Sequence, residues 1–298
     1  MIQPVRSNAA LLADIRAANR PDRGFRLWWL GQSGFLLQWQ GVHVLLDPYL
    51  SDSLTRKYSQ TDKPHVRMTD LVIAPSDLSF VDVVTSSHNH TDHLDAETLG
   101  PILAHNPQLK LLIAEANRAF VADRLRIQPA TPIGLDDGGA TELSGVRFSG
   151  VASAHETVER DDLGRVKTLG YVLQFGDWSL YHSGDTLRYD GMAEKLRPFA
   201  VDVALLPING RAPERRVPGN LSGQEAAQLA HDIGAKMAIP CHFEMFEFNT
   251  ASPDEFIETC RRLGQPFRVM RCGERFESGR KANDRALGSV ARRARLSV

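Results

Sequence analysis

The sequence has few cysteines and no long apolar run. Three cysteines occur among 298 residues, none in a CxxC pair, and their odd number argues against a disulfide framework. No stretch approaches the about eighteen uninterrupted apolar residues that a membrane span needs. The N-terminal segment carries charges throughout and lacks the apolar core of a signal peptide. We therefore expect a soluble, cytoplasmic protein without a membrane span.

The chain also lacks an excess of charge of either sign. It contains 35 Lys and Arg residues and 36 Asp and Glu residues, which gives a formal net charge of -1 at pH 7. This balance gives no electrostatic reason to expect nucleic acid or an anionic membrane as the main partner. We expect a small-molecule partner instead, and the sequence does not decide between a monomer and a homo-oligomer.

Alternating strand and helix patterns predict a layered α/β protein. Three apolar runs within residues 25–47 are separated by short turns, which suggests antiparallel hairpins, and residues 48–79 are predicted to form a long functional loop. Strands then alternate with helices, one of which begins with a predicted capping box of Ser222 and Glu225. The pattern repeats in the second half and ends with a predicted strand at 267–272. This order favours two mixed β-sheets faced by helices.

We expect a single domain over residues 1–276, followed by a basic tail over residues 277–298. Beside Asp284, the tail contains six cationic residues: Arg280, Lys281, Arg285, Arg292, Arg293 and Arg295. This composition is compatible with a basic docking helix. A solvated chain end is the simpler interpretation, and we prefer it.

Three histidines and an aspartate gather within the stretch SSHNHTDHLD. They are His88, His90, Asp92 and His93, and they follow the apolar run VDVVTSS, which predicts a buried strand. Loops at strand ends are where ligands and catalytic groups gather in open α/β sheets. One ion takes three or four ligands, so this cluster suits a shared pair of ions better than a single ion.

Further ligand-type residues stand at the ends of other predicted strands. His155 ends VRFSGVASAH, Asp185 ends SLYHSGD, and His242 follows KMAIPC. His182 lies within a predicted strand, so we expect its side chain to point away from the ions. The remaining histidines are expected to be ordinary hydrogen-bonding groups at the surface or in the core: His43, His65, His105 and His231.

The motif HNHTDH resembles the HxHxDH motif of the metallo-β-lactamase superfamily, and His155, Asp185 and His242 match its later ligand positions in order. The stretches WLGQSGFLL, LLDPYLSDS, HSGDT and LLPING resemble the lactonase-like branch that includes L-ascorbate-6-phosphate lactonase. The resemblance implies a four-layer αβ/βα sandwich with two metal ions at the edge between its sheets.

The resemblance also implies how the ligands divide. Seven residues hold two ions: His88, His90 and His155 one, Asp92, His93 and His242 the other, with Asp185 bridging. Asp47 in LLDPYL matches a family aspartate that orients a ligand imidazole, although a turn ahead of Pro48 explains it equally well. Imidazole and carboxylate suit zinc, manganese and iron alike; the superfamily favours zinc and the lactonase branch manganese.

A two-ion site of this kind indicates hydrolysis of an ester, lactone, amide or phosphodiester. Two divalent ions lower the pKa of a shared water toward about 7, and Asp92 is placed to orient the hydroxide and relay a proton. We expect a small ester or lactone as the substrate. A phosphorylated sugar lactone would suit three cations that we predict to bind it, namely Lys63, Arg67 and Arg211. The stretch HFEMFEFN supplies aromatic side chains, either for pocket lining or for core packing.

Three alternative functions remain beside this hydrolase. A phosphodiesterase of the N-acyl phosphatidylethanolamine phospholipase D type would use the same metals. A flavo-diiron oxidoreductase would have a glutamate in place of His90 and an added flavodoxin domain, and the sequence has neither. A non-catalytic binding protein on this fold usually lacks some ligands, whereas all seven are present here. The sequence therefore favours a metal-dependent hydrolase.

Overall fold

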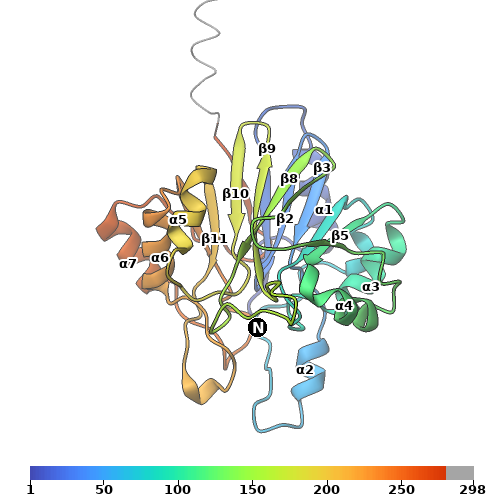
Figure 1. The fold of residues 1–298 in the computed structure, drawn as a ribbon. Helices are drawn as coiled ribbons and strands as arrows, with labels where there is room; N and C mark the ends of the chain where they lie inside the picture. The colour runs from blue at the N-terminus through green and yellow to red at the C-terminus, as the bar shows by residue number, and fades with distance from the viewer. Residues whose placement is uncertain (280–298) are drawn as a thin grey trace, which may run out of the picture.

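The computed structural model describes residues 1–279, whose strands form two mixed sheets (Figure 1). The seven-stranded first sheet has the order β13-β1-β2-β3-β4-β5-β6: β1 (Arg26–Gly31), β2 (Gly34–Trp39), β3 (Val42–Leu46), β4 (Val83–Ser86), β5 (Lys110–Ala114), β6 (Ile133–Leu135) and β13 (Arg275–Glu277). The six-stranded second sheet has the order β12-β11-β10-β9-β8-β7: β7 (Ala140–Leu143), β8 (Val146–Ala152), β9 (Leu169–Phe175), β10 (Trp178–His182), β11 (Val203–Pro207) and β12 (Met237–Cys241).

Both sheets are built in the same order along the chain. An antiparallel meander comes first, formed by β1 to β3 in one sheet and by β7 to β10 in the other. Parallel strands follow, from β3 to β6 and from β10 to β12. This repetition confirms the two mixed sheets expected from the sequence.

Helices cover the outer faces of the paired sheets. The α-helices are α1 (Asn8–Ala18), α2 (Ser53–Tyr58), α3 (Ala96–His105), α4 (Arg118–Leu125), α5 (Met192–Leu196), α6 (Gly223–Asp232) and α7 (Asp254–Leu263). In Figure 1, α1, α3 and α4 lie on the side of the first sheet, whereas α5, α6 and α7 lie on the side of the second. Up to residue 279, four 3-10 turns complete the helical segments: η1 (Pro75–Asp77), η2 (Glu115–Asn117), η3 (Arg197–Phe199) and η4 (Pro213–Arg215).

Strand β1 shows why the sheets lie between other layers. Its residues are buried on both faces: Leu27 and Trp29 belong to the core between the sheets, while Trp28 and Leu30 pack with α1 and α3. A strand covered on both faces has an almost continuous apolar sequence, and RLWWLG fits that rule. The αβ/βα sandwich is therefore the observed architecture.

Two predicted segments differ from the structure. Residues 48–79 are not one continuous loop, because α2 and η1 lie within them. The segment 267–272 is not a strand; only Phe267 forms an isolated bridge, to Ala238 of β12, and the last strand is β13. The apolar side chains of 267–272 reflect packing against the core instead of strand pairing.

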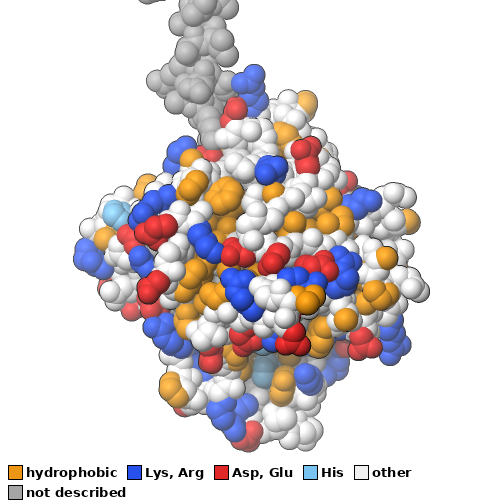
Figure 2. Space-filling model, viewed as in Figure 1, with side chains coloured by type: hydrophobic (Ala, Val, Ile, Leu, Met, Phe, Trp, Pro, Cys, Tyr) orange, Lys and Arg blue, Asp and Glu red, His pale blue; other side chains and the backbone are white. Residues whose placement is uncertain are grey.

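Strand pairing and backbone hydrogen bonds continue through the last described residues. Glu277 belongs to β13 and pairs with Arg26, and the Ser278 backbone N–H donates to Phe25 O at 3.0 Å. The cations predicted for the basic tail, from Arg280 onward, lie outside the described residues. Within residues 1–279, no helix has the length and apolar character to cross a membrane. Figure 2 shows Lys and Arg side chains interspersed with Asp and Glu on the face in view.

Candidate metal centre

Seven polar side chains meet at one edge of the two sheets. The loop after β4 contributes four and the loops after β8, β10 and β12 contribute one each: His88, His90, Asp92, His93, His155, Asp185 and His242. Strands β8 and β10 both run antiparallel to β9, and β12 runs parallel to β10 through β11, so all three end at the same edge. The structure thus brings together the whole set predicted from the sequence.

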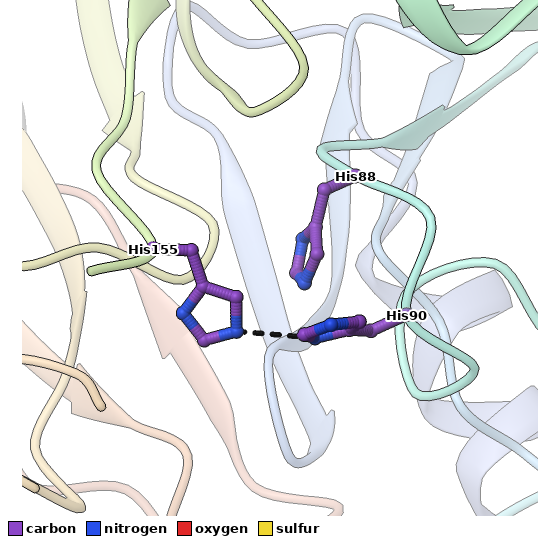
Figure 3. A group of neighbouring side chains, drawn as sticks. All are labelled: His88, His90 and His155. Carbon is purple, nitrogen blue, oxygen red and sulfur yellow. Dashed lines mark hydrogen bonds between the residues drawn. The ribbon is translucent and has the colours of Figure 1, made fainter. Parts of the chain in front are cut away.

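One group consists of His88, His90 and His155, whose ligand-type nitrogens all lie within 4.8 Å of one another (Figure 3). His155 Nε2 lies 3.1 Å from His90 Nδ1. The other ring nitrogen of His155, Nδ1, lies 3.2 Å from the carbonyl oxygen of Gly219, to which it can donate. This contact leaves the Nε2 lone pair of His155 facing the other two imidazoles.

A second group consists of Asp92, His93 and His242. His242 Nε2 lies 3.5 Å from Asp92 Oδ2, and His93 Nε2 lies 3.7 Å from the same oxygen. Asp185 lies between the groups, because its Oδ1 is 3.2 Å from His93 Nε2 and its Oδ2 is 3.3 Å from His242 Nε2 and 3.7 Å from His155 Nε2. A carboxylate in this position contacts both groups at once.

Asp47 is fully buried behind the cluster and contacts His93. Its Oδ2 accepts a hydrogen bond from His93 Nδ1 at 2.8 Å, and its Oδ1 accepts from the hydroxyl of Thr85 at 3.0 Å. The backbone N–H of Ser87 donates to the same carboxylate at 3.1 Å. With Nδ1 donating to Asp47, the Nε2 of His93 faces Asp185 at 3.2 Å. Burial lowers the pKa of His93, but Asp185 and Asp92 outweigh it and raise that pKa well above its ordinary value. Asp47 also has a φ of +39° before Pro48, so its backbone makes the tight turn that the sequence suggested.

Burial and mutual contact shift the protonation of these groups. Burial and the neighbouring imidazoles hold the pKa of His88 well below its ordinary value, which keeps the ring neutral. Burial by itself raises the pKa of Asp185, but His242 and His93 outweigh it and hold that pKa well below the ordinary range. Burial lowers the pKa of His242, but Asp185 and Asp92 outweigh it and raise that pKa to about 9. Carboxylates and imidazoles therefore stabilise one another's charges here.

Three buried ligand-type atoms in this cluster form no hydrogen bond. Nε2 of His88 has no partner, whereas Nε2 of His93 and Oδ1 of Asp185 contact each other at 3.2 Å without hydrogen-bond geometry. One ligand-type atom from each of these residues lies within 4.8 Å of the others. A buried polar atom without a partner costs about 1–3 kcal/mol, so this convergence requires an explanation. Imidazole nitrogens and carboxylate oxygens are the donors that divalent transition metals bind. The residues present therefore fit a metal centre.

The cluster opens into a recess of about 300 Å³. Its lining includes five of the seven clustered residues: His90, Asp92, His155, Asp185 and His242. Aromatic rings form much of the remaining surface, from Tyr58, His65, Phe246 and Phe248, and two cations, Lys57 and Arg124, also reach it. As expected, His182 does not line the recess; its Nε2 lies 2.9 Å from the carbonyl oxygen of Ser33.

The three cations predicted to bind substrate do not line this recess. Arg67 is buried, and its Nε donates to Asp52 Oδ1 at 2.6 Å. Arg211 forms a two-pronged pair with Glu225, at 2.9 and 2.8 Å, and lines a separate surface cavity. The ammonium of Lys63 donates to the carbonyl oxygen of Glu214. Each of these cations thus has a partner outside the recess, and their predicted role in substrate binding stays a prediction.

Sequence reasoning also missed three residues that line the recess: Gln32, Lys57 and Arg124. Gln32 Nε2 donates to Asp92 Oδ2 at 2.8 Å and lies 3.0 Å from His242 Nε2. Its presence in WLGQSGFLL, one of the stretches that carry the family resemblance, was the available signal. Arg124 donates to the carbonyl oxygen of Asn89 at 2.7 Å, and no sequence pattern links α4 to that loop.

Comparisons with known proteins agree with this geometry. A family model described as "Beta-lactamase superfamily domain" matches residues 26–242, a span that contains all seven clustered residues. A "UPF0173 metal-dependent hydrolase" of Opitutus terrae is 31% identical over 259 residues, which cover 85% of this chain and 99% of the relative.

Solved structures share the fold. Igni18, described as a novel metallo hydrolase from Ignicoccus hospitalis, superposes with a TM-score of 0.63 at 22% identity, covering 87% of this chain and 100% of its own. An isothiocyanate hydrolase from Delia radicum gut bacteria superposes with a TM-score of 0.66 at 20% identity, covering 85% of this chain and 100% of its own. At these identities the likeness concerns the fold alone.

Proposed function

The chain belongs to the metallo-β-lactamase superfamily, as a metal-dependent hydrolase of the UPF0173 family, and we propose that it hydrolyses a small ester or lactone at a two-ion centre. The observation that carries the proposal is the convergence of buried ligand-type atoms of His88, His93 and Asp185 that form no hydrogen bond. They connect two triads of ligand-type residues, which is what a shared pair of ions requires.

We assign the ligands by the triads in the structure. His88, His90 and His155 would hold one ion, Asp92, His93 and His242 the other, and Asp185 would contact both. Their imidazoles and carboxylates suit zinc, manganese and iron alike, so the donor set leaves the choice among these metals to measurement. When bound, two divalent ions supply a water of lowered pKa and a Lewis acid for the carbonyl oxygen.

Asp92 is the residue that we propose to handle the proton. Its side chain lines the recess, and Gln32 Nε2 fixes its Oδ2 by donating at 2.8 Å. Burial raises the pKa of Asp92, but His93 and His242 outweigh it and lower that pKa, so the carboxylate stays charged at neutral pH. A charged carboxylate at the recess can accept a hydrogen bond from the attacking water and so orient it.

The size of the recess supports a small substrate. About 300 Å³ lies at the lower end of the range for ligand pockets, which suits one ester or lactone group with a modest substituent. The expectation that the lactone carries a phosphate was based on Lys63, Arg67 and Arg211, and these cations do not line the recess. We therefore propose the ester or lactone without a requirement for phosphate.

Metal analysis combined with a substrate panel tests the proposal. Protein purified after metal supplementation should contain two ions per chain and should hydrolyse esters or lactones until a chelator is added. His90→Ala should lose an ion and nearly all activity, whereas His231→Ala, at an exposed position on α6, should keep both. Well under one ion per chain would contradict the metal centre. Turnover of phosphodiesters alone would replace this proposal by a phosphodiesterase.

A further inference from the structure

Four aromatic side chains form a continuous surface beside the metal centre. Tyr58, His65, Phe246 and Phe248, here called the aromatic wall, all line the recess. Tyr58 and His65 stack with ring centroids 4.2 Å apart and an interplanar angle of 16°. The His65 ring also contacts Phe248 at 4.4 Å and Phe246 at 5.2 Å. The proposed ligands and the wall thus face one cavity.

The wall is held in place by the backbone. Segments 65–68 and 245–247 lie side by side: the N–H of Met68 donates to Met245 O at 2.8 Å, and the N–H of Glu247 donates to Val66 O at 3.0 Å. Arg67 and Phe246 form the antiparallel bridge between them. These contacts join two loops far apart in the sequence, so the wall exists before any ligand binds.

Buried Arg67 connects this paired segment to α2, which carries Tyr58. Its Nε donates to Asp52 Oδ1 at 2.6 Å, and Asp52 is the residue that precedes α2. The guanidinium also lies over the ring of Tyr49, 5.4 Å from its centroid, and the Tyr49 hydroxyl accepts from the N–H of Leu54 at 3.0 Å. Arg67 therefore supports the wall from behind.

The wall presents uncharged aromatic faces. His65 Nδ1 lies 3.1 Å from the carbonyl oxygen of Lys63, to which it can donate, and burial lowers the pKa of its imidazole. Tyr58 and Phe248 are only partly buried, packed against a small core that contains Leu54 and Phe246. Their remaining surface is therefore accessible from the recess, and flat apolar surface of this kind stacks on aromatic rings.

We propose that the aromatic wall binds an aryl ring of the substrate while its ester or lactone group reaches the metal centre. This inference rests on the proposed function and narrows it to aryl-bearing esters or lactones. Burying a ring against such a surface contributes a factor of about 10–100 in affinity, which is enough to determine substrate preference.

The test compares two esters with the same reacting group. Ethyl 3-phenylpropanoate and ethyl propanoate differ by a ring two methylenes from the carbonyl, so their intrinsic reactivity is similar. We expect kcat/KM to be about tenfold higher or more for the ring-bearing ester. Phe248→Ala and Tyr58→Ala should bring the ratio close to one while the metal content stays unchanged. Phe199→Ala, which removes a partly buried ring at the end of η3, should preserve the ratio.

Binding of the product acids tests the aromatic wall independently of hydrolysis. By calorimetry, the wild-type protein should bind 3-phenylpropanoate about tenfold more tightly than propanoate, and Phe248→Ala should remove the difference. Equal binding of both acids by the wild-type protein would overturn the inference. A preference for 3-phenylpropanoate that persists in both Phe248→Ala and Tyr58→Ala would overturn it as well. The protein could also prefer 3-phenylpropanoate through the wall and yet hydrolyse neither ester. That result would support the role of the aromatic wall in binding aryl rings and contradict the proposed ester hydrolysis.

Discussion

His93 shows how neighbouring side chains prepare one imidazole to bind a metal. Asp47 accepts from its Nδ1 at 2.8 Å, and Thr85 and Ser87 in turn fix the carboxylate. Because the carboxylate accepts from Nδ1, the Nε2 of His93 is directed toward Asp185 and can bind an ion once it gives up its proton. The affinity of the proposed centre for metal would therefore depend on residues that do not touch the ions.

Asp47→Asn tests this dependence. The amide has nearly the same size but no negative charge, so it should weaken metal binding by about 10–100-fold while the fold survives. Competition with a coloured chelator measures the change. Asp62→Asn, at an exposed position paired with Arg216, is the matched control and should leave the affinity unchanged. Unchanged affinity in Asp47→Asn itself would show that Asp47 only shapes the turn.

Asp92→Asn addresses the proposed proton-handling role. The substitution keeps an oxygen ligand but removes charge and basicity, so turnover should fall by about 10²–10⁴-fold. Metal content and circular dichroism of the same sample identify any loss of ions or of structure. Normal turnover with a full complement of metal would disprove the role assigned to Asp92.

At the scale of residues, the meeting of the seven ligand-type side chains could be predicted and the partners of the cations could not. His155, Asp185 and His242 each follow an apolar strand, so a local pattern places them at the sheet edge. Arg211 also follows such a strand, yet its guanidinium pairs with Glu225, a residue that the sequence linked only to the capping box with Ser222. Partners of long cationic side chains depend on tertiary contacts, which no local pattern contains.

At the scale of elements, long periodic segments were predictable and short ones were not. The capping box of Ser222 and Glu225 is present, and α6 begins where it predicts. Helix α2 has six residues, too few for a periodic pattern, and tertiary contacts support it, including the hydrogen bond from Leu54 N to the Tyr49 hydroxyl. The apolar segment 267–272 matched a strand pattern because packing against the core and pairing within a sheet both favour apolar residues.

A histidine in strand β3 leads us to expect that the free energy of unfolding depends on pH. His43 is buried there, with its Nε2 2.9 Å from Gln38 Nε2, a donor that requires an unprotonated acceptor. Burial lowers the pKa of His43 despite Asp82 nearby. The unfolded chain, with a His pKa of about 6.5, therefore binds more protons than the folded protein as the pH falls below that value, and the free energy of unfolding decreases.

His43→Gln should reduce this loss of stability, because glutamine does not titrate and still offers Gln38 an acceptor. Urea unfolding at pH 7 and pH 5, with metal present throughout, measures the difference between variant and wild type. His105→Gln, at an exposed position at the end of α3, serves as the control. If His43→Gln and the wild-type protein lost equal stability between these pH values, the stabilising contribution assigned to neutral His43 would be wrong.

At the scale of the whole molecule, the proposed centre connects the two sheets. The loop after β4 of the first sheet carries four ligand-type residues, and three strands of the second sheet carry the other three. Each half repeats the same order of antiparallel and then parallel strands, so the edges where these loops emerge face each other. Bound ions would therefore add a link between halves that are already joined by apolar packing and by hydrogen bonds such as that from the Tyr171 hydroxyl to Ser86 O.

Metal removal should accordingly lower the stability of the whole fold. A ligand at about 1,000 times its Kd stabilises the folded state by about 4 kcal/mol, which corresponds to a rise in Tm of roughly 10 °C for a domain of this size. Scanning calorimetry with saturating metal and with chelator measures the increment. His88→Ala in the first half and His242→Ala in the second should each abolish most of it, although they lie on different sheets, whereas exposed His231→Ala should retain it. An unchanged Tm after complete removal of the ions would show that bound ions add nothing to the contacts that already join the sheets.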